Sequence, residues 1–383
     1  MLVQLRRDLR SLFGPRPSPL IKRPPSPHYP ATGASDSAAR ARTLEVVDVT
    51  RETADAVTLT LRDPAGAAIP FVPGQFFTLI VALGDDAPLR RAYSASSSHL
   101  DPSRVTITVK RVEGGRVSSH LVDTAAVGMR LAVLGPSGDF TLAPDAAAAR
   151  HVVAIAGGSG ITPILSITRA VLDVEPASRV TLLYGNRDAA SIIFAHELDA
   201  LVAASAGRLV VRHVLEDASG RPGANTGRLD AATVAAELDA CRGCDAGATY
   251  YVCGPEAMMA EARTALLARA VTAANIREER FSSPARRQTS VAPTTQPVTI
   301  RRAGVALDVI VRAGDTILDA GLAAGVPLRL SCAMGGCGEC AVKLTAGDVA
   351  MDEPNCLSDA ERAGGKILAC VARPLTPCTV EAP

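Results

Sequence analysis

The sequence is poor in aromatic residues: it has no tryptophan, and aromatic residues make up 3% of its 383 positions. Platforms that stack single-stranded nucleic acid need several aromatic side chains, so this scarcity argues against them. Charge is also nearly balanced, with a formal net charge of +1 at pH 7. A balanced chain has no global electrostatic attraction to a polyanion. Nucleic acid is therefore not an expected partner.

Long apolar runs are missing as well. No stretch of about 18 apolar residues occurs, so we expect no transmembrane segment. The N-terminal stretch MLVQLRRDLRSLFG has no uninterrupted apolar run, which argues against a secretory signal. Nine cysteines, an odd number without such a signal, indicate a reducing compartment, and we expect a cytoplasmic location.

What the chain does have is a dense group of cysteines in RLSCAMGGCGECAVKL, residues 329–344. The spacing is Cys332-x4-Cys337-x2-Cys340, and Cys370 follows about thirty residues later. This is the ligand spacing of a plant-type [2Fe–2S] cluster. The intervening glycines can adopt positive φ and wrap the loop around the metal. A zinc site is the alternative, but zinc usually takes two C-x2-C pairs, and only one is present here.

Periodicity divides the chain into parts. Alternating strands without helices predict an antiparallel β-barrel, and the following strand–turn–helix repeats predict a doubly wound α/β domain. The last part, with short strands, one helix and the cysteine loop, predicts an α+β ferredoxin domain. The expected boundaries are an extended Pro-rich tail (1–42), the barrel (43–147), the α/β domain (148–281), a linker (282–297) and the ferredoxin domain (298–383).

The stretch LRRAYSASSS follows a predicted barrel strand and suits a flavin. A phosphate favours a guanidinium, an isoalloxazine ring an aromatic face, and the flavin N5 atom a hydroxyl; Arg91, Tyr93 and Ser94 offer these groups. Alternate residues of a strand share a face, so Arg91 and Tyr93 could reach one ligand. In GGRVSSHL, Gly115 and Ser118 would open a helix, whose N-terminus is a ready pyrophosphate site.

The stretch AGGSGITP follows a buried apolar strand and precedes a helix. Gly158 and Gly160 form a G-x-G turn, but Pro163 stands where the third glycine of the Rossmann fingerprint would be. Thr162 lies near the helix start, where it could meet a phosphate. A plain βα turn is the alternative reading.

Taken together, RAYS, KRVEGGRVSSHL, GGSGITP and YYVCGPEAMM resemble the ferredoxin–NADP reductase superfamily. The order of barrel, nucleotide domain and C-terminal ferredoxin is similar to fused reductases that serve oxygenases, above all the phenylacetyl-CoA epoxidase and 3-ketosteroid 9α-hydroxylase reductase components. The resemblance implies that Arg91 binds the flavin phosphates, Tyr93 stacks on the ring and Ser94 bonds N5. It also implies that Gly115 and Ser118 cradle a pyrophosphate, which favours FAD over FMN.

The same resemblance places Cys253, followed by Gly254 and Pro255, beside the nicotinamide. Cys253 ends a predicted parallel strand, where such sheets bind ligands. Without the resemblance, a lone cysteine at a strand end is better explained by buried packing.

The choice between NADPH and NADH depends on the residues after the strand VTLLYG. Arg187 and Ser191 could hold a 2′-phosphate, whereas Asp188 could accept a hydrogen bond from a ribose 2′-hydroxyl. In the superfamily an Arg/Ser pair here favours the phosphate, so we expect NADPH, with NADH as the alternative.

These features predict a flavin and iron–sulfur reductase that passes electrons from NADPH through FAD and a [2Fe–2S] cluster to an oxygenase, hydroxylase or desaturase. A self-sufficient diaphorase or quinone reductase is the alternative enzyme, and an iron–sulfur redox sensor is the alternative of another class. A sensor needs neither flavin nor nicotinamide motifs, so their presence counts against it.

The tail lies outside the resemblance. On a helix its first leucines would form one apolar stripe beside Arg6, Arg7 and Arg10, a pattern typical of weak membrane-surface contact. Packing on the protein's own surface, disorder and an organelle transit segment are the alternatives. Among the other cysteines, Cys241-x-x-Cys244 lacks the context of a redox motif, and Cys356 and Cys378 are expected to be spare small apolar residues.

Overall fold

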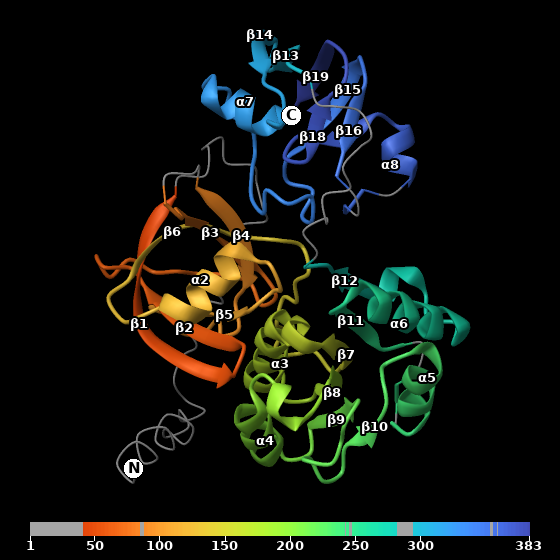
Figure 1. The fold of residues 1–383 in the computed structure, drawn as a ribbon. Coiled ribbons are helices and arrows are strands. Elements are labelled where there is room, and N and C mark those ends of the chain that lie inside the picture. The colour runs from red at the N-terminus through yellow and green to blue at the C-terminus, as the bar shows by residue number, and fades with distance from the viewer. Residues whose placement is uncertain are drawn as a thin grey trace. The chain divides into compact units, whose positions relative to one another are not determined.

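The computed structural model describes residues 41–84, 88–241, 243–244, 247–281, 294–352, 355–357 and 359–383. The expected tail falls outside these residues except for 41–42; of the expected linker, residues 294–297 are described, and β13 begins at Gln296. Within the described part of the chain the strands form three large sheets and one two-stranded sheet (Figure 1).

The first sheet is antiparallel throughout, with strand order β4-β3-β6-β1-β2-β5. An isolated bridge between Ala95 and Ile107 joins its two edges, which closes the sheet into the predicted barrel. Its elements are β1 (Arg42–Thr53), β2 (Ala56–Arg62), β3 (Phe76–Val81), β4 (Leu89–Ser94), β5 (Arg104–Lys110), α2 (Arg116–Thr124) and β6 (Arg130–Ser137).

The second sheet is parallel, with order β10-β9-β8-β7-β11-β12, and alternates with helices as predicted. Its strands are β7 (His151–Gly157), β8 (Arg179–Asn186), β9 (Leu209–Leu215), β10 (Asn225–Thr226), β11 (Thr249–Cys253) and β12 (Ile276–Glu279). Its α-helices are α3 (Ile161–Val174), α4 (Ala195–Ala204), α5 (Ala231–Asp239) and α6 (Glu256–Ala268), with 3₁₀ turns η1 (Gly158–Gly160), η2 (Ala189–Ser191) and η3 (Ala273–Asn275).

Strand β7 shows why this sheet is covered on both faces. Val152 and Ala154 pack in one core with residues of α3 and α4, whereas Val153 and Ile155 pack in the other core with residues of α5 and α6. Side chains alternate along a strand, so a continuous apolar run is the sequence form of a strand buried on both sides. The chain reverses its direction of winding beside β7, and that reversal opens a crevice at the carboxyl ends of the strands.

The third sheet is mixed, with order β14-β13-β19-β15-β17, and belongs to the C-terminal ferredoxin domain. Its strands are β13 (Gln296–Arg302), β14 (Val305–Val311), β15 (Ala341–Ala346), β17 (Lys366–Leu368) and β19 (Cys378–Ala382). Helices α7 (Ile317–Ala323) and α8 (Asp359–Ala363) and the small sheet of β16 (Val349–Met351) and β18 (Ala372–Pro374) complete it.

Thr316 accepts the Asp319 N–H at 3.1 Å and thereby caps α7. In the described part of the chain, no helix combines the length and apolar character that a membrane span requires.

Candidate functional site

Strand β4 carries the residues predicted to hold a flavin. Arg91 and Tyr93 leave the same face of the strand, opposite Leu79 and Phe77 on β3. Burial raises the pKa of the Tyr93 phenol above its ordinary value, although the nearby Arg91 charge opposes this. Tyr93 therefore offers a neutral ring beside a half-buried cation, an arrangement that fits an aromatic ring system joined to a phosphate.

The start of helix α2 has the form of an anion site. A Cβ atom on Gly115 would lie 2.5 Å from Ser118 Oγ and 2.9 Å from the Val112 carbonyl oxygen, so only glycine fits. Ser118 Oγ accepts the Val112 N–H at 3.1 Å. The hydroxyl predicted to touch a pyrophosphate is thus engaged in shaping the turn. Among the described residues no side-chain hydrogen bond caps the helix at Gly115, and a helix N-terminus attracts anions.

Ser94 ends β4 and meets a residue that the sequence analysis did not single out. Its hydroxyl donates to Glu279 Oε2 at 3.3 Å, and Glu279 pairs with Cys253 across the parallel ladder of β11 and β12. Removal of the Glu279 carboxyl from water raises its pKa to about 8. Burial, reinforced by the Glu279 charge, likewise raises the pKa of the Cys253 thiol. Three protonated groups therefore gather at this point near neutral pH.

The glycine turn after β7 packs directly against the end of β11. A Cβ atom on Gly160 would lie 2.1 Å from the Cys253 carbonyl oxygen, and one on Gly254 would lie 2.9 Å from the Gly157 nitrogen. A Cβ atom on Gly157 would lie 2.6 Å from Pro255 Cδ. The absence of side chains thus lets the two predicted nucleotide segments touch through their backbones.

Other predicted residues of the glycine turn stabilise its conformation. Thr162 is buried, and its hydroxyl donates to the Ser159 carbonyl oxygen at 3.1 Å. Pro163 lies in the first turn of α3, where a missing N–H costs no helical hydrogen bond. Gly158 has a φ of +51°, and Lys110 Nζ lies 3.5 Å from the position that a Cβ atom on Gly158 would take. Lys110 therefore adds a cation to the glycine turn.

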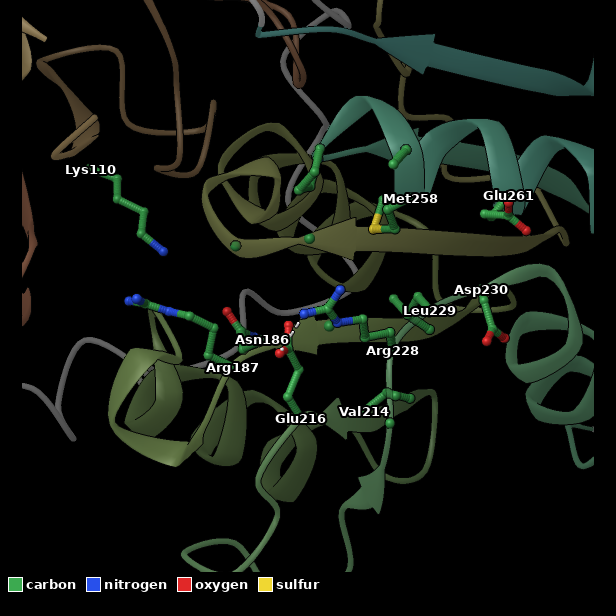
Figure 2. A pocket seen from close by; sticks show the side chains of 16 residues that line it. Lys110, Asn186, Arg187, Val214, Glu216, Arg228, Leu229, Asp230, Met258 and Glu261 are labelled. Atoms are coloured by element: carbon green, nitrogen blue, oxygen red, sulfur yellow. Dashed lines mark hydrogen bonds and ion pairs between the residues drawn. The ribbon is translucent and has the colours of Figure 1, made fainter. Parts of the chain in front are cut away.

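A cavity of about 460 Å³ opens at the carboxyl ends of β7, β8 and β9 (Figure 2). Arg187 points into it and forms a 3.5 Å ion pair with Asp55. Arg228 also lines the cavity and forms a 2.9 Å ion pair with Glu216. The lining further includes Lys110, Gly157, Gly158, Gly185, Asn186, Val214, Gly227, Leu229, Asp230, Pro255, Ala257, Met258 and Glu261. Its position and its glycine-rich floor are those of a dinucleotide site.

Ser191 does not line this cavity. It forms a capping box with Asp188: its N–H donates to Asp188 Oδ1 at 2.8 Å, and its hydroxyl accepts the Asp188 N–H at 3.1 Å. The side chain of Ser191 is buried. Of the pair predicted to hold a 2′-phosphate, the structure therefore brings only Arg187 to the cavity.

The four predicted cluster ligands come together in two pairs. The Cys337 thiol donates a hydrogen bond to Cys332 Sγ, and the Cys370 thiol donates one to Cys340 Sγ. The Cys337 hydrogen bond and backbone N–H groups, including that of Met334, lower the pKa of Cys332 against the effect of burial. In each pair one thiol has a lowered pKa, Cys332 or Cys340, and the grouping of the four cysteines two by two fits two irons that share them.

Two of the three glycines between the cluster cysteines have the positive φ that was predicted, and Gly336 does not. Gly335 and Gly338 have φ values of +78° and +74°, which other residues adopt only at a cost. Cys356 lies against this loop: its N–H donates to the Gly335 carbonyl oxygen at 2.9 Å. The residue is exposed on the surface, which does not fit the expected packed apolar role. Partial burial of the thiol and the charges of Cys332 and Cys340 raise its pKa to about 11.

The pair Cys241 and Cys244 behaves as packed thiols. The two thiols share a hydrogen bond, and burial raises the pKa of both, for Cys244 to about 11. A raised pKa lowers the fraction of reactive thiolate.

Sequence reasoning missed four residues: Lys110, Glu216, Arg228 and Glu279. Lys110 begins KRVEGGRVSSHL, so its place before the predicted pyrophosphate turn was a usable signal. Glu216 directly follows a strand of the parallel sheet, another position that a ligand can reach. Arg228 and Glu279 carry no local signal, because only folding brings them to the site.

The sequence matches three family models in the order of these sites. They are the oxidoreductase FAD-binding domain over residues 43–142, the oxidoreductase NAD-binding domain over residues 154–264 and the 2Fe-2S iron-sulfur cluster binding domain over residues 300–375. The predicted cofactors FAD, a nicotinamide dinucleotide and a [2Fe–2S] cluster are thereby confirmed, as is the oxidoreductase class.

Full-length relatives show the same arrangement. The chain is 37% identical to one of the subunits of 1,2-phenylacetyl-CoA epoxidase from Escherichia coli (strain K12), over 87% of this chain and 95% of that protein. It is 35% identical to the ferredoxin reductase component of 3-ketosteroid-9-alpha-monooxygenase from Mycolicibacterium smegmatis, over 87% and 94%. The solved structure of phthalate dioxygenase reductase matches with a TM-score of 0.63 at 25% identity, over 89% of this chain and 97% of that one. The chain therefore belongs to the family of NAD(P)H-dependent reductases in which an FAD-binding, an NAD-binding and a 2Fe-2S domain follow one another in a single polypeptide.

Proposed function

We propose that the protein takes electrons from a reduced nicotinamide dinucleotide and delivers them singly to an oxygenase, hydroxylase or desaturase. Bound FAD supplies the step from two electrons to one, and the [2Fe–2S] cluster relays them outward. The relatives whose names describe monooxygenase and epoxidase components support this kind of acceptor. Nine free cysteines fit a reducing compartment, and we propose the cytoplasm.

The observation that carries the proposal is a small cavity of about 40 Å³ between the predicted flavin site and the cluster loop. Ser94 and Glu279 line it together with Cys332 and Met334 of the cluster loop. Cys253, at the end of the nucleotide crevice, pairs with Glu279 across the ladder. A donor, a two-electron carrier and a one-electron carrier bound at these residues would be neighbours, as electron relay requires.

We assign separate roles to the residues in and around this small cavity. Arg91 and Tyr93 hold the flavin phosphate and ring, and Ser94 orients toward N5. Cys253 stays a neutral thiol and offers an uncharged surface to the nicotinamide. The Glu279 carboxyl, hydrogen-bonded to Ser94, can hold a proton at neutral pH and exchange it through the hydroxyl.

At the outer end, the four paired cysteines hold the cluster. The backbone N–H groups that face Cys332 stabilise negative charge on sulfur, which tunes how readily the cluster accepts an electron. The expected acceptor receives electrons from this domain.

The variant Cys337→Ser tests the relay. We expect it to lose the electron paramagnetic resonance signal of the reduced cluster yet keep NAD(P)H-to-ferricyanide activity within about twofold, because ferricyanide can take electrons from the flavin. The matched control is Cys356→Ser, which lies against the same loop and should keep both. Loss of ferricyanide activity together with the signal, or a signal lost in the control, would contradict the proposal.

A further inference from the structure

Two arginines that line the nucleotide cavity each already face a carboxylate. Arg228 Nη2 lies 2.9 Å from Glu216 Oε2, and Arg187 Nη2 lies 3.5 Å from Asp55 Oδ2. Figure 2 shows the Glu216 and Arg228 side chains meeting in the cavity. Glu216 therefore neutralises Arg228, whereas Asp55 also lies 4.0 Å from Lys110 Nζ and is shared between Arg187 and Lys110.

Backbone hydrogen bonds hold Glu216 in this place. Its N–H donates to the Asn186 carbonyl oxygen at 3.2 Å, and the next N–H, of Asp217, donates to the Arg187 carbonyl oxygen at 2.8 Å. The segments that follow β8 and β9 are therefore tied together, and the Glu216 carboxylate cannot leave the wall without breaking that tie or turning its side chain outward.

The position of Glu216 and Arg228 relative to the glycine turn indicates which part of a bound dinucleotide they contact. Gly158 and Lys110 form the cationic, N–H-lined end that suits the pyrophosphate. Cys253 lies with Ser94 and Glu279, where the nicotinamide has to reach the flavin. Glu216 and Arg228 line the part of the cavity beyond the end of β9, which is left for the adenosine ribose. In such sheets an acidic side chain accepts from the ribose 2′-hydroxyl, whereas an arginine accommodates a 2′-phosphate.

We propose that Glu216 determines the choice of nicotinamide dinucleotide: it accepts a hydrogen bond from the ribose 2′-hydroxyl, keeps Arg228 engaged and makes the enzyme favour NADH over NADPH. This inference rests on the proposed function only in assuming that the cavity binds the electron donor. It replaces the expected preference for NADPH, which depended on Arg187 together with Ser191. Ser191 is engaged in its capping box, and an acid stands opposite the arginine.

Because the Glu216–Arg228 ion pair is exposed, a substitution can remove it and change the nucleotide preference. The side chains of Arg228 and Glu216 are 77% and 43% exposed. An exposed ion pair is weak by itself, so removing Glu216 should free Arg228 without unfolding the wall. A freed arginine can form a charge-assisted hydrogen bond to a phosphate, which corresponds to about a tenfold gain in affinity or more.

The test is titration of the oxidised, FAD- and cluster-loaded protein with NAD⁺ and NADP⁺, measured by isothermal calorimetry. We expect the wild-type protein to bind NAD⁺ about tenfold more tightly than NADP⁺, and Glu216→Gln to shift the ratio of dissociation constants by about tenfold toward NADP⁺. The double variant E216Q/R228Q should lose that gain, because the guanidinium that binds the phosphate is gone.

The matched control is Asp239→Asn, which removes one acidic charge from an exposed ion pair with Arg269 in the same domain, away from the cavity. It should leave the ratio within twofold. A wild-type preference for NADP⁺, a shift of less than threefold in E216Q, or an equal shift in D239N would overturn the proposal. A protein that binds both nucleotides as expected but does not pass electrons to its cluster would contradict the proposed function instead.

Discussion

Among single residues, Glu279 has a pKa that differs from its ordinary value in a way that suits proton transfer. An isolated glutamate is ionised at neutral pH, but burial raises the pKa of this one to about 8, and Cys332 of the cluster loop adds to the shift. The Ser94 hydrogen bond lowers the pKa only in part. Because a catalytic acid or base works best with a pKa near the working pH, Glu279 is suited to hold and release the proton that accompanies flavin turnover.

We therefore expect a pH dependence that Glu279→Gln removes. The folded-state pKa lies above the unfolded value, so the folded protein holds the extra proton, and stability is lost as the pH rises from about 4.5 through 8. The wild-type melting temperature should fall across this window more than that of E279Q. The NAD(P)H-to-ferricyanide rate should titrate near pH 8 in the wild type alone. Parallel pH profiles of the two proteins, in both melting temperature and rate, would argue against this role.

At the scale of elements, the nucleotide crevice depends on how closely the turn η1 approaches the end of β11. Gly160 has a φ of −62°, which any residue can adopt, so its requirement is space rather than conformation. A Cβ atom there would meet the Cys253 carbonyl oxygen at 2.1 Å and the Gly254 nitrogen at 2.8 Å. These are backbone atoms, and they cannot rotate away as a side chain could.

Gly160→Ala should therefore push α3 and β11 apart, destabilise the protein by about 1–3 kcal/mol and weaken binding of both NAD⁺ and NADP⁺. Gly223→Ala is the control in the same domain: its Cβ atom meets nothing within 4 Å, and its φ of +84° costs only about 1–2 kcal/mol. Denaturant unfolding and nucleotide titration measure the two effects. If nucleotide binding survives in G160A, close backbone contact is not what forms the crevice.

At the scale of the whole molecule, the three cofactor sites belong to residues 41–383, and each has its own sheet and core. The basic, leucine-striped segment at the N-terminus lies outside the described residues. The sequence alone carries the hypothesis of weak membrane-surface contact.

Deleting residues 1–40 should leave FAD content, iron content and ferricyanide activity unchanged. If the segment contacts membranes, the full-length protein should sediment with anionic liposomes at low salt, remain in the supernatant at high salt and lose sedimentation on deletion, because screening weakens the attraction of its arginines to the lipid charge. Full-length protein that stays in the supernatant at low salt would rule out membrane contact.

The sequence by itself determined the features that depend on residues close together along the chain. The spacing of Cys332, Cys337 and Cys340 limits how their thiols can gather around a metal, and the glycines between them supply the backbone freedom that the loop uses. The alternation of apolar residues likewise predicted an antiparallel barrel and a parallel sheet, because side-chain period and strand burial are local properties. Gly158 and Gly160 were recognisable for the same reason.

Only the tertiary structure decided which of these groups meet. Ser94 and Glu279 are 185 positions apart and become partners because β12 joins the edge of the parallel sheet beside β11. Arg228 reaches Glu216 from a different loop, whereas Ser191, a plausible phosphate ligand in the sequence, closes a capping box instead. A hydroxyl or carboxylate has several possible hydrogen-bond partners, and the sequence does not rank them. The partner that it finds depends on strand order and burial, which are set by packing across the whole fold.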